Sequence, residues 1–369
     1  MRPFRIDVPD AVIEDLRARL AAARLLEDSP NRPPSGMSSG YLRELVASWA
    51  VFDWRRREAW LNRHPQFLAD VGDTTIHFVH QRADSDDAPA LLVMHGWPHL
   101  FSLQLDYADL LPDFNVVVAS LPGFAFSTPY FAGPITETRL AATMHRLMTE
   151  VLGYDRYLTY GEDVSANVND LIAATHRDAV AGILVTHAHF PTGEQRRDVR
   201  LPDERAFFDR LAAKHQTDGA YGHVQATRPD TLAVGLNDSP AGLLAWLVEK
   251  LVEWSDTPAG DPSSIERRIS RDRLLTEAMI YWVTQSIGSS FRPYYEGADT
   301  PGPIPPVPLP AAVFIQRHEG DYPVSLAHDF YRDLRVFERL DTGGHFTVGE
   351  VPAEMAARTR AFAEDLGLL

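Results

Sequence analysis

Residues 156–167 read Arg-Tyr-Leu-Thr-Tyr-Gly-Glu-Asp-Val-Ser-Ala-Asn, and this stretch decides the fold. The pattern predicts a buried strand that passes into a helix through a tight turn centred on Asp163. Gly161 and Ser165, two positions on either side, are small enough to let the strand and the helix approach closely. The amide groups that open the helix favour a negative charge, so the pKa of Asp163 should stay low. This is the layout of a nucleophile elbow with aspartate as the nucleophile.

Asp163 has a second interpretation, because aspartate is also a common helix cap, and the segment alone does not separate the two. A second segment favours catalysis. Residues 91–98, Leu-Leu-Val-Met-His-Gly-Trp-Pro, predict a buried strand that breaks into a turn. An exposed amide in such a turn forms part of an oxyanion hole. We expect the backbone amides of Trp97 and Val164 to form that hole.

A third segment supplies a base. Residues 341–346, Asp-Thr-Gly-Gly-His-Phe, place His345 on a glycine turn after a short predicted strand at 336–340. The upstream run 317–321, Arg-His-Glu-Gly-Asp, supplies a carboxylate to orient this histidine. The order nucleophile, acid and histidine is the one expected for α/β-hydrolases. The agreement of these segments favours the catalytic interpretation over the helix cap.

Short β-rich runs alternate with helical segments through much of the chain. This alternation predicts an α/β fold with a mostly parallel sheet flanked by helices. The predicted strands lie at 75–80, 90–94, 115–119, 156–160, 180–186 and 311–316.

Two regions are predicted to be mainly helical instead. Residues 1–70 form an N-terminal arm, with a helix from Pro9-Asp10 onwards and a second helical stretch at 41–63. Residues 190–300 form a helical cap, inserted between core segments 71–189 and 301–369. The six prolines of 301–310 predict a stiff, extended linker back to the core.

Composition excludes several classes of function. The net charge of −16, from 51 acidic and 35 basic side chains, opposes binding to nucleic acid or to an anionic membrane surface. The absence of cysteine removes disulfides, thiolate nucleophiles and cysteine-ligated metals, and it fits a cytoplasmic protein. No apolar run is long enough to span a membrane, and no signal sequence is recognised at the start. We expect no membrane partner, and a homodimer is left open.

No sequence pattern predicts a cofactor. The chain contains no P-loop, no dinucleotide glycine fingerprint and no His-Glu-x-x-His helix. His187 and His189 are conceivable metal ligands, but histidines at the end of a buried strand are more often structural or pocket-lining. We therefore expect neither a cofactor nor a metal.

With these segments in place, the chain resembles the microsomal-type epoxide hydrolases, including their helical N-terminal region but without a membrane anchor. The resemblance extends over nearly the whole length and is most specific in the cap, at 219–229, 235–243, 249–250 and 288–296. It implies an α/β-hydrolase fold and, by position, makes Tyr221 and Tyr294 the two phenols that bind the epoxide oxygen. Without the resemblance, both would be interpreted as buried tyrosines with satisfied hydroxyl groups.

The chain departs from the family pattern beside the nucleophile. The usual Gly-Gly-Asp-Trp-Gly is replaced by Gly-Glu-Asp-Val-Ser, which predicts an altered pocket floor at Glu162 and Val164. The position of the acid also has two solutions. Counting back from His345 selects Glu319, whereas counting forward from Phe314 reaches an arginine. Glu319 is therefore preferred, and Asp321 is the alternative.

The resemblance implies hydrolysis of an epoxide to a diol, through an ester of Asp163 that is hydrolysed by water activated at His345. Because Phe, Trp and Tyr are abundant in both the N-terminal arm and the cap, we expect an apolar or aromatic epoxide. The partners are then the small-molecule epoxide and water. A haloalkane dehalogenase would need a tryptophan directly after the nucleophile, where this chain has Val164. A serine esterase would need serine in place of Asp163. A non-hydrolytic ring-opening, ring-closing or binding protein on the same fold is the remaining alternative.

Overall fold

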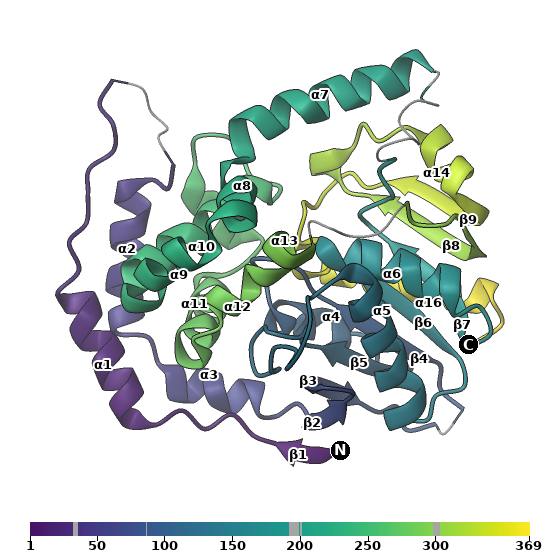
Figure 1. Ribbon diagram of the computed structural model, residues 1–369, viewed down its shortest axis with the longest axis horizontal. Coiled ribbons are helices and arrows are strands. Elements are labelled where there is room, and N and C mark those ends of the chain that lie inside the picture. Colours follow the sequence, from purple (N-terminus) through teal and green to yellow (C-terminus); the bar gives the residue numbers. More distant parts are fainter. Residues whose placement is uncertain (32–35, 86, 192–198, 200, 298–302) are drawn as a thin grey trace.

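The computed structural model describes residues 1–31, 36–85, 87–191, 199, 201–297 and 303–369 (Figure 1). Its centre is a nine-stranded sheet, counted over these residues, in the order β1-β2-β3-β5-β4-β6-β7-β8-β9. β1, β2, β3 and β5 pair antiparallel in succession, and every pairing from β5 to β9 is parallel. The strands are β1 (Arg2–Phe4), β2 (Gln66–Val71), β3 (Thr74–Gln81), β4 (Ala90–Met94), β5 (Asn115–Ala119), β6 (Tyr157–Gly161), β7 (Val180–Val185), β8 (Val307–Ile315) and β9 (Tyr331–Arg339).

Two groups of helices accompany the sheet. In one group, α5 and α6 pack together and α6 packs on β6, β7 and β8; in the other, α16 packs on α4 and α15. Side chains of β4 and β5 are buried along their whole length, as expected for strands covered on both faces. The helices are α4 (Leu105–Asp109), α5 (Glu137–Arg146), α6 (Val164–Thr175), α14 (Val324–Phe330), α15 (Thr347–Glu350) and α16 (Pro352–Asp365).

Between β7 and β8 the chain leaves the sheet and forms a further set of helices, here called the inserted helices. They lie above the carboxyl ends of the central strands, with α7 reaching over towards β8 and β9 (Figure 1). Proline opens α7, α9 and α10, where its missing N–H costs no helical hydrogen bond. The inserted helices are α7 (Pro202–Asp218), α8 (Ala220–Thr227), α9 (Pro229–Asp238), α10 (Pro240–Trp254), α11 (Arg271–Thr284), α12 (Ile287–Ser290) and α13 (Arg292–Glu296).

The N-terminal region contributes helices and strands. Its helices are α1 (Asp10–Ala21), α2 (Ser39–Ala50) and α3 (Trp54–Leu61), and both α1 and α2 contact α10 (Figure 1). The single helical stretch predicted at 41–63 is divided, because the Asp53 side chain accepts a hydrogen bond from the Arg56 amide and starts a new helix. The edge strand β1 and its neighbour β2 were not predicted, and they attach this region to β3.

The proline-rich return segment also differs from the prediction. Residues 301–302 lie outside the described part of the chain, but β8 already begins at Val307, inside the stretch predicted as a linker. Pro308 and Pro310 are accommodated because the register of β8 against β9 is irregular between Val307 and Pro310. Prolines tolerate such places because no regular ladder hydrogen bond is lost. Along the described residues, no helix combines the length and apolarity needed to cross a bilayer.

Candidate active site

Asp163 lies between β6 and α6 in a backbone conformation, φ 56° and ψ −125°, that residues other than glycine rarely adopt. Close backbone approach explains the turn. A Cβ atom on Gly161 would lie 2.1 Å from the carbonyl oxygen of Ser165, and one on Gly96 would lie 2.3 Å from the Cβ of Asp163. Glycine is therefore required at both positions. The turn holds Asp163 at the carboxyl end of β6, the edge of a parallel sheet where ligands bind.

The carboxylate of Asp163 is held by the two amides predicted for the oxyanion hole. The Trp97 amide donates to Oδ1 over 3.0 Å, and the Val164 amide also donates to the carboxylate. The second oxygen, Oδ2, lies 3.4 Å from Nε2 of His345. Burial opposes ionisation, but His345 and the two amides outweigh it and lower the pKa of Asp163. The group is therefore a carboxylate at neutral pH.

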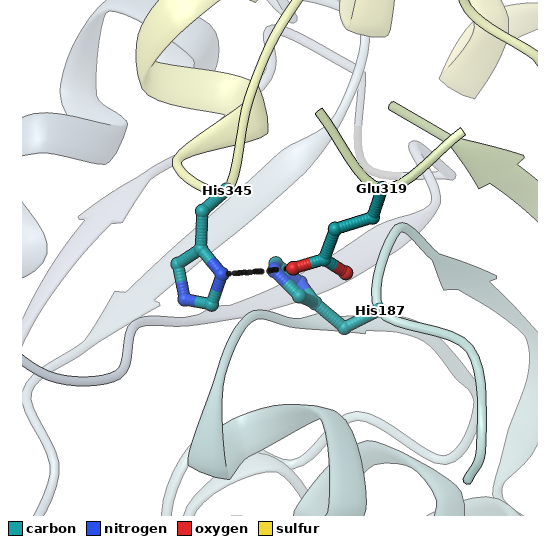
Figure 2. A group of neighbouring side chains, drawn as sticks. All are labelled: His187, Glu319 and His345. Atoms are coloured by element: carbon teal, nitrogen blue, oxygen red, sulfur yellow. Dashed lines mark hydrogen bonds and ion pairs between the residues drawn. The ribbon is translucent and has the colours of Figure 1, made fainter. Parts of the chain in front are cut away.

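His345 lies in the loop between β9 and α15, where its amide donates to the carbonyl of Trp254 over 2.9 Å. Its Nδ1 atom lies 3.5 Å from Oε1 of Glu319 (Figure 2). Burial opposes protonation, but Asp163 and Glu319 outweigh it and raise the pKa of His345 to about 10. The resting site thus contains an imidazolium between two carboxylates.

The structure brings Glu319 to the histidine and Asp321 to another partner. Glu319 belongs to the short 3-10 helix η6 (Arg317–Glu319) after β8, and the pKa of its carboxyl group is lowered. Burial opposes that shift, and His345 and His187 outweigh it. Asp321 is exposed and pairs with Arg210 of α7. Of the two predicted acids, only Glu319 faces the base.

His187 is a neighbour of the base that the sequence analysis did not identify as such. Its Nε2 atom lies 3.0 Å from Nδ1 of His345, closer than Glu319 (Figure 2). Burial lowers the pKa of His187 to about 4, so its ring is neutral and accepts this hydrogen bond. The available signal was its place directly after β7, the neighbour of the elbow strand. His189, considered with it as a metal ligand, instead stacks on Phe330, with 3.7 Å between ring centroids.

One group of side chains in the described residues has the composition of a metal site. The ligand atoms of His187, Glu319 and His345 lie within 4.8 Å of one another (Figure 2). Two nitrogens and a carboxylate oxygen suit a divalent ion such as zinc. In the structure the two facing nitrogens already share a hydrogen bond. The closeness of these three side chains is thus explained by the hydrogen bonding and charge pairing of the base His345, without a metal ion.

The two predicted phenols come from the inserted helices, Tyr221 from α8 and Tyr294 from α13. Their ring centroids are 6.1 Å apart, and a hydrogen bond links their hydroxyl groups. Tyr221 stacks on Trp97 with 5.4 Å between centroids and 9° between planes. Burial, followed by the negative charge of Asp163, raises the pKa of both tyrosines. Both hydroxyl groups therefore remain protonated donors at neutral pH.

Aromatic rings surround these phenols. Trp254 of α10 lies 4.9 Å from the Tyr221 ring and 5.0 Å from the His345 ring, centroid to centroid. Phe291 lies 6.2 Å from the ring of Trp97. A mostly apolar wall with two hydroxyl groups and one carboxylate can bind a small apolar molecule and polarise one of its oxygens. Trp254 could not be predicted from the sequence, because nothing in α10 alone indicates which face of the helix turns to the sheet.

The expectation that Glu162 changes the pocket floor is corrected by the structure. The residue is 1% exposed, and its carboxylate is taken up by neighbouring groups of the protein. Oε1 accepts hydrogen bonds from the hydroxyl of Tyr160 and the amide of Val348, and Oε2 lies 3.0 Å from Nε2 of His99. The side chain of Val164 is partly buried against the hydrophobic core.

Comparison with known proteins identifies the family. Residues 1–102 match the family model described as "Epoxide hydrolase N terminus". A relative from Stigmatella aurantiaca that carries an epoxide hydrolase name is 34% identical, over 97% of this chain and 83% of its own length. The solved juvenile hormone epoxide hydrolase of the silkworm Bombyx mori has a TM-score of 0.86 and 26% identity, covering 100% of this chain and 94% of that one. The Aspergillus niger epoxide hydrolase has a TM-score of 0.84 and 26% identity, covering 99% and 96%. The resemblance inferred from the motifs is confirmed: the chain belongs to the epoxide hydrolase family and has the α/β-hydrolase fold.

Proposed function

We propose that this epoxide hydrolase converts an apolar or aromatic epoxide to a vicinal diol through a covalent ester of Asp163. The observation that carries the proposal is the environment of that carboxylate. One oxygen accepts from the Trp97 amide over 3.0 Å, and the other lies 3.4 Å from His345. A nucleophile, its base and the donors for a later oxyanion are therefore already assembled around one side chain.

Ring opening requires two groups at once. An epoxide is strained, but its alkoxide is a poor leaving group, so attack on carbon must be accompanied by donation to oxygen. Asp163 attacks one ring carbon while the hydroxyl groups of Tyr221 and Tyr294 donate to the departing oxygen. Because both phenols come from the inserted helices, these helices act as a cap that completes the site.

The charges explain how His345, protonated in the resting enzyme, becomes the base for ester hydrolysis. While Asp163 is ionised, His345 is held protonated, and an imidazolium is no base. Ester formation removes the negative charge of Asp163, which lowers the pKa of His345. The opened ring oxygen takes up one proton as the imidazolium gives one up. A neutral base then faces the new ester.

Ester hydrolysis uses the same groups. His345 takes a proton from water, and the hydroxide attacks the carboxyl carbon of Asp163. The negative charge then develops on the former carboxylate oxygen. The amides of Trp97 and Val164, which donate to this carboxylate in the resting enzyme, stabilise that charge. Release of the diol regenerates Asp163.

The surroundings support an apolar substrate. The aromatic wall formed by Trp97, Trp254 and Phe291 offers faces on which a flat or hydrophobic group packs. The cysteine-free composition supports a cytoplasmic setting.

Isotope labelling tests the ester directly. The enzyme, in excess over a styrene-oxide-like epoxide, is allowed one turnover in heavy-oxygen water. We expect the first diol to contain unlabelled oxygen taken from Asp163, and the peptide containing Asp163 to gain one heavy oxygen by mass spectrometry. Heavy oxygen in the first-turnover diol would mean that water attacks the ring directly, and the ester mechanism would be abandoned.

The two phenols should act on ring opening alone. Replacing Tyr221 or Tyr294 with phenylalanine is expected to slow ester formation by about 10²-fold, because one of two donors to the oxygen is lost. Hydrolysis of the preformed ester should change little. Rapid-quench measurement of the two steps checks this, with Tyr295→Phe as the matched control, since Tyr295 is exposed and outside the aromatic cluster. Equal slowing of both steps would assign the phenols a structural role only.

A further inference from the structure

A buried hydrogen-bonded chain connects His345 to Glu162. It consists of four side chains, here called the relay: His187, Thr186, Tyr160 and Glu162. The distances along it are 3.0 Å from His345 Nδ1 to His187 Nε2 and 3.4 Å from His187 Nδ1 to Thr186 Oγ1. They continue with 3.0 Å from Thr186 Oγ1 to the Tyr160 hydroxyl and 2.6 Å from that hydroxyl to Glu162 Oε1. All four members are at least 94% buried.

The proton positions along the relay follow from its last member. Tyr160 has one hydroxyl proton and donates it to Glu162, so Thr186 must donate to the oxygen of Tyr160. Thr186 then accepts from Nδ1–H of His187, which leaves Nε2 of that ring as an acceptor. The neutral state of His187 agrees with this tautomer. His345 must therefore donate from Nδ1, and each donor in the chain is used once.

The relay ends on a carboxylate. Oε1 of Glu162 also accepts from the Val348 amide over 3.1 Å, and Oε2 pairs with His99. Burial opposes ionisation, but the hydrogen bonds from His99 and Tyr160 outweigh it and lower the pKa of Glu162. A hydrogen-bonded chain of this polarity stabilises positive charge at its donor end.

We propose that the relay makes Glu162 a second orienting acid for His345, in addition to Glu319. The proposal rests on the function proposed above, because it concerns the base that hydrolyses the ester. The relay members are positioning residues: they hold Nδ1 protonated and leave Nε2 free to take the proton of water. They act when Asp163 is esterified and has lost its charge, so that the imidazolium formed in hydrolysis depends on the remaining carboxylates.

The relay also explains the departure beside the nucleophile. In the Gly-Gly-Asp pattern that the elbow resembles, position 162 is glycine and offers no carboxylate. Here Glu162 is buried and is connected to the base through Tyr160, Thr186 and His187. Nε2 of His187 lies closer to Nδ1 of His345 than Glu319 does. Glu162 and His187, to which the sequence alone assigned no catalytic role, are therefore both members of the relay.

Step-resolved kinetics test the proposal. Ester formation and ester hydrolysis are measured separately, by rapid quench and by the fluorescence of the tryptophans beside the site. His187→Leu removes the acceptor and is expected to slow ester hydrolysis about 10- to 100-fold, with ester formation changed less than about 3-fold. His187→Gln retains an acceptor of similar reach and should recover most of that loss. His189→Leu, at the same strand end but outside the relay, is the matched control and should leave both steps unchanged.

A second variant tests the end of the relay. Glu162→Gln keeps the size of the side chain but removes its charge, so it should slow ester hydrolysis and lower the pKa of His345 in the ester. The acid limb of ester hydrolysis then moves to lower pH, by about half a unit. The other groups that face the relay or the base are unchanged in this variant: Asp163 (esterified), Glu319, His318, His99 and Tyr107.

The outcomes separate the two proposals. Equal rates of ester hydrolysis in His187→Leu and His187→Gln would overturn the relay, because a packing role does not distinguish the two side chains. If the acid limb of the pH profile of ester hydrolysis does not shift in Glu162→Gln, Glu162 does not act on His345 and is not part of the relay. In both cases the wild-type enzyme still forms the ester. A wild-type enzyme that forms no ester would refute the proposed function, and the relay with it.

Discussion

Replacement of Asp163 by alanine is expected to lower kcat/KM by roughly 10⁴- to 10⁶-fold, the scale of loss when a covalent nucleophile is removed. Alanine offers no oxygen to attack the ring, and no other described carboxylate has two amide donors and a protonated histidine around it. Diol formation from a styrene-oxide-like epoxide, compared with the reaction in buffer alone, measures the loss. No covalent adduct should form at the altered position.

The control for this variant is a measurement that shows that it is still folded. Alanine fits where Asp163 sits, because the near approach of Gly96 limits size and alanine is smaller. The far-ultraviolet circular dichroism should therefore match that of the wild type. Removal of the carboxylate also takes away the main support for protonated His345, so the pKa of this histidine should fall from about 10. Diol formation within 100-fold of wild type in the folded variant would contradict a nucleophilic role.

Several features of the fold and the site could be predicted because local sequence determines them. The strand, small residues and aspartate of 156–163 indicate a strained turn whatever surrounds it, and β4 and β5 have the predicted bounds of 90–94 and 115–119. The loop of His345 was predicted for the same reason, since a glycine pair before a histidine indicates a tight turn that other residues would not permit. In these segments periodicity and turn chemistry agree with the final packing.

Features that depend on distant contacts were not predicted. β1 and β2 are short, and only pairing with β3 makes them strands. Glu162 was expected in the pocket floor, because sequence gives the order of side chains around a turn but not which side faces the pocket. The contact of His187 with His345 joins positions 158 residues apart, so no local pattern contains it. Glu319 and Asp321 are two positions apart in the sequence, and only the three-dimensional structure shows that Glu319 lies beside His345 whereas Asp321 pairs with Arg210.

The second large effect is expected at His345. His345→Gln keeps a polar side chain near Asp163 but provides no base, so ester hydrolysis should slow by roughly 10³-fold or more. Ester formation needs no base, and Tyr221 and Tyr294 still donate to the ring oxygen, so this step should slow less than about 10-fold. The enzyme therefore accumulates as the covalent ester, and intact-protein mass spectrometry should find an added mass equal to one substrate molecule, located by digestion at Asp163.

Two carboxylate variants serve as matched controls for this trap. Glu319→Gln weakens the support of the base and should accumulate part of the ester at steady state. Asp321→Asn alters an exposed carboxylate that pairs with Arg210, so it should behave like the wild type. The order of ester accumulation, His345→Gln above Glu319→Gln above Asp321→Asn, follows from their relation to the base: His345 is the base, Glu319 lies beside it, and Asp321 pairs with Arg210 instead. If the His345→Gln protein remains unmodified after prolonged exposure to a good substrate, the histidine is needed for ester formation itself. The assignment of His345 to ester hydrolysis alone would then be wrong.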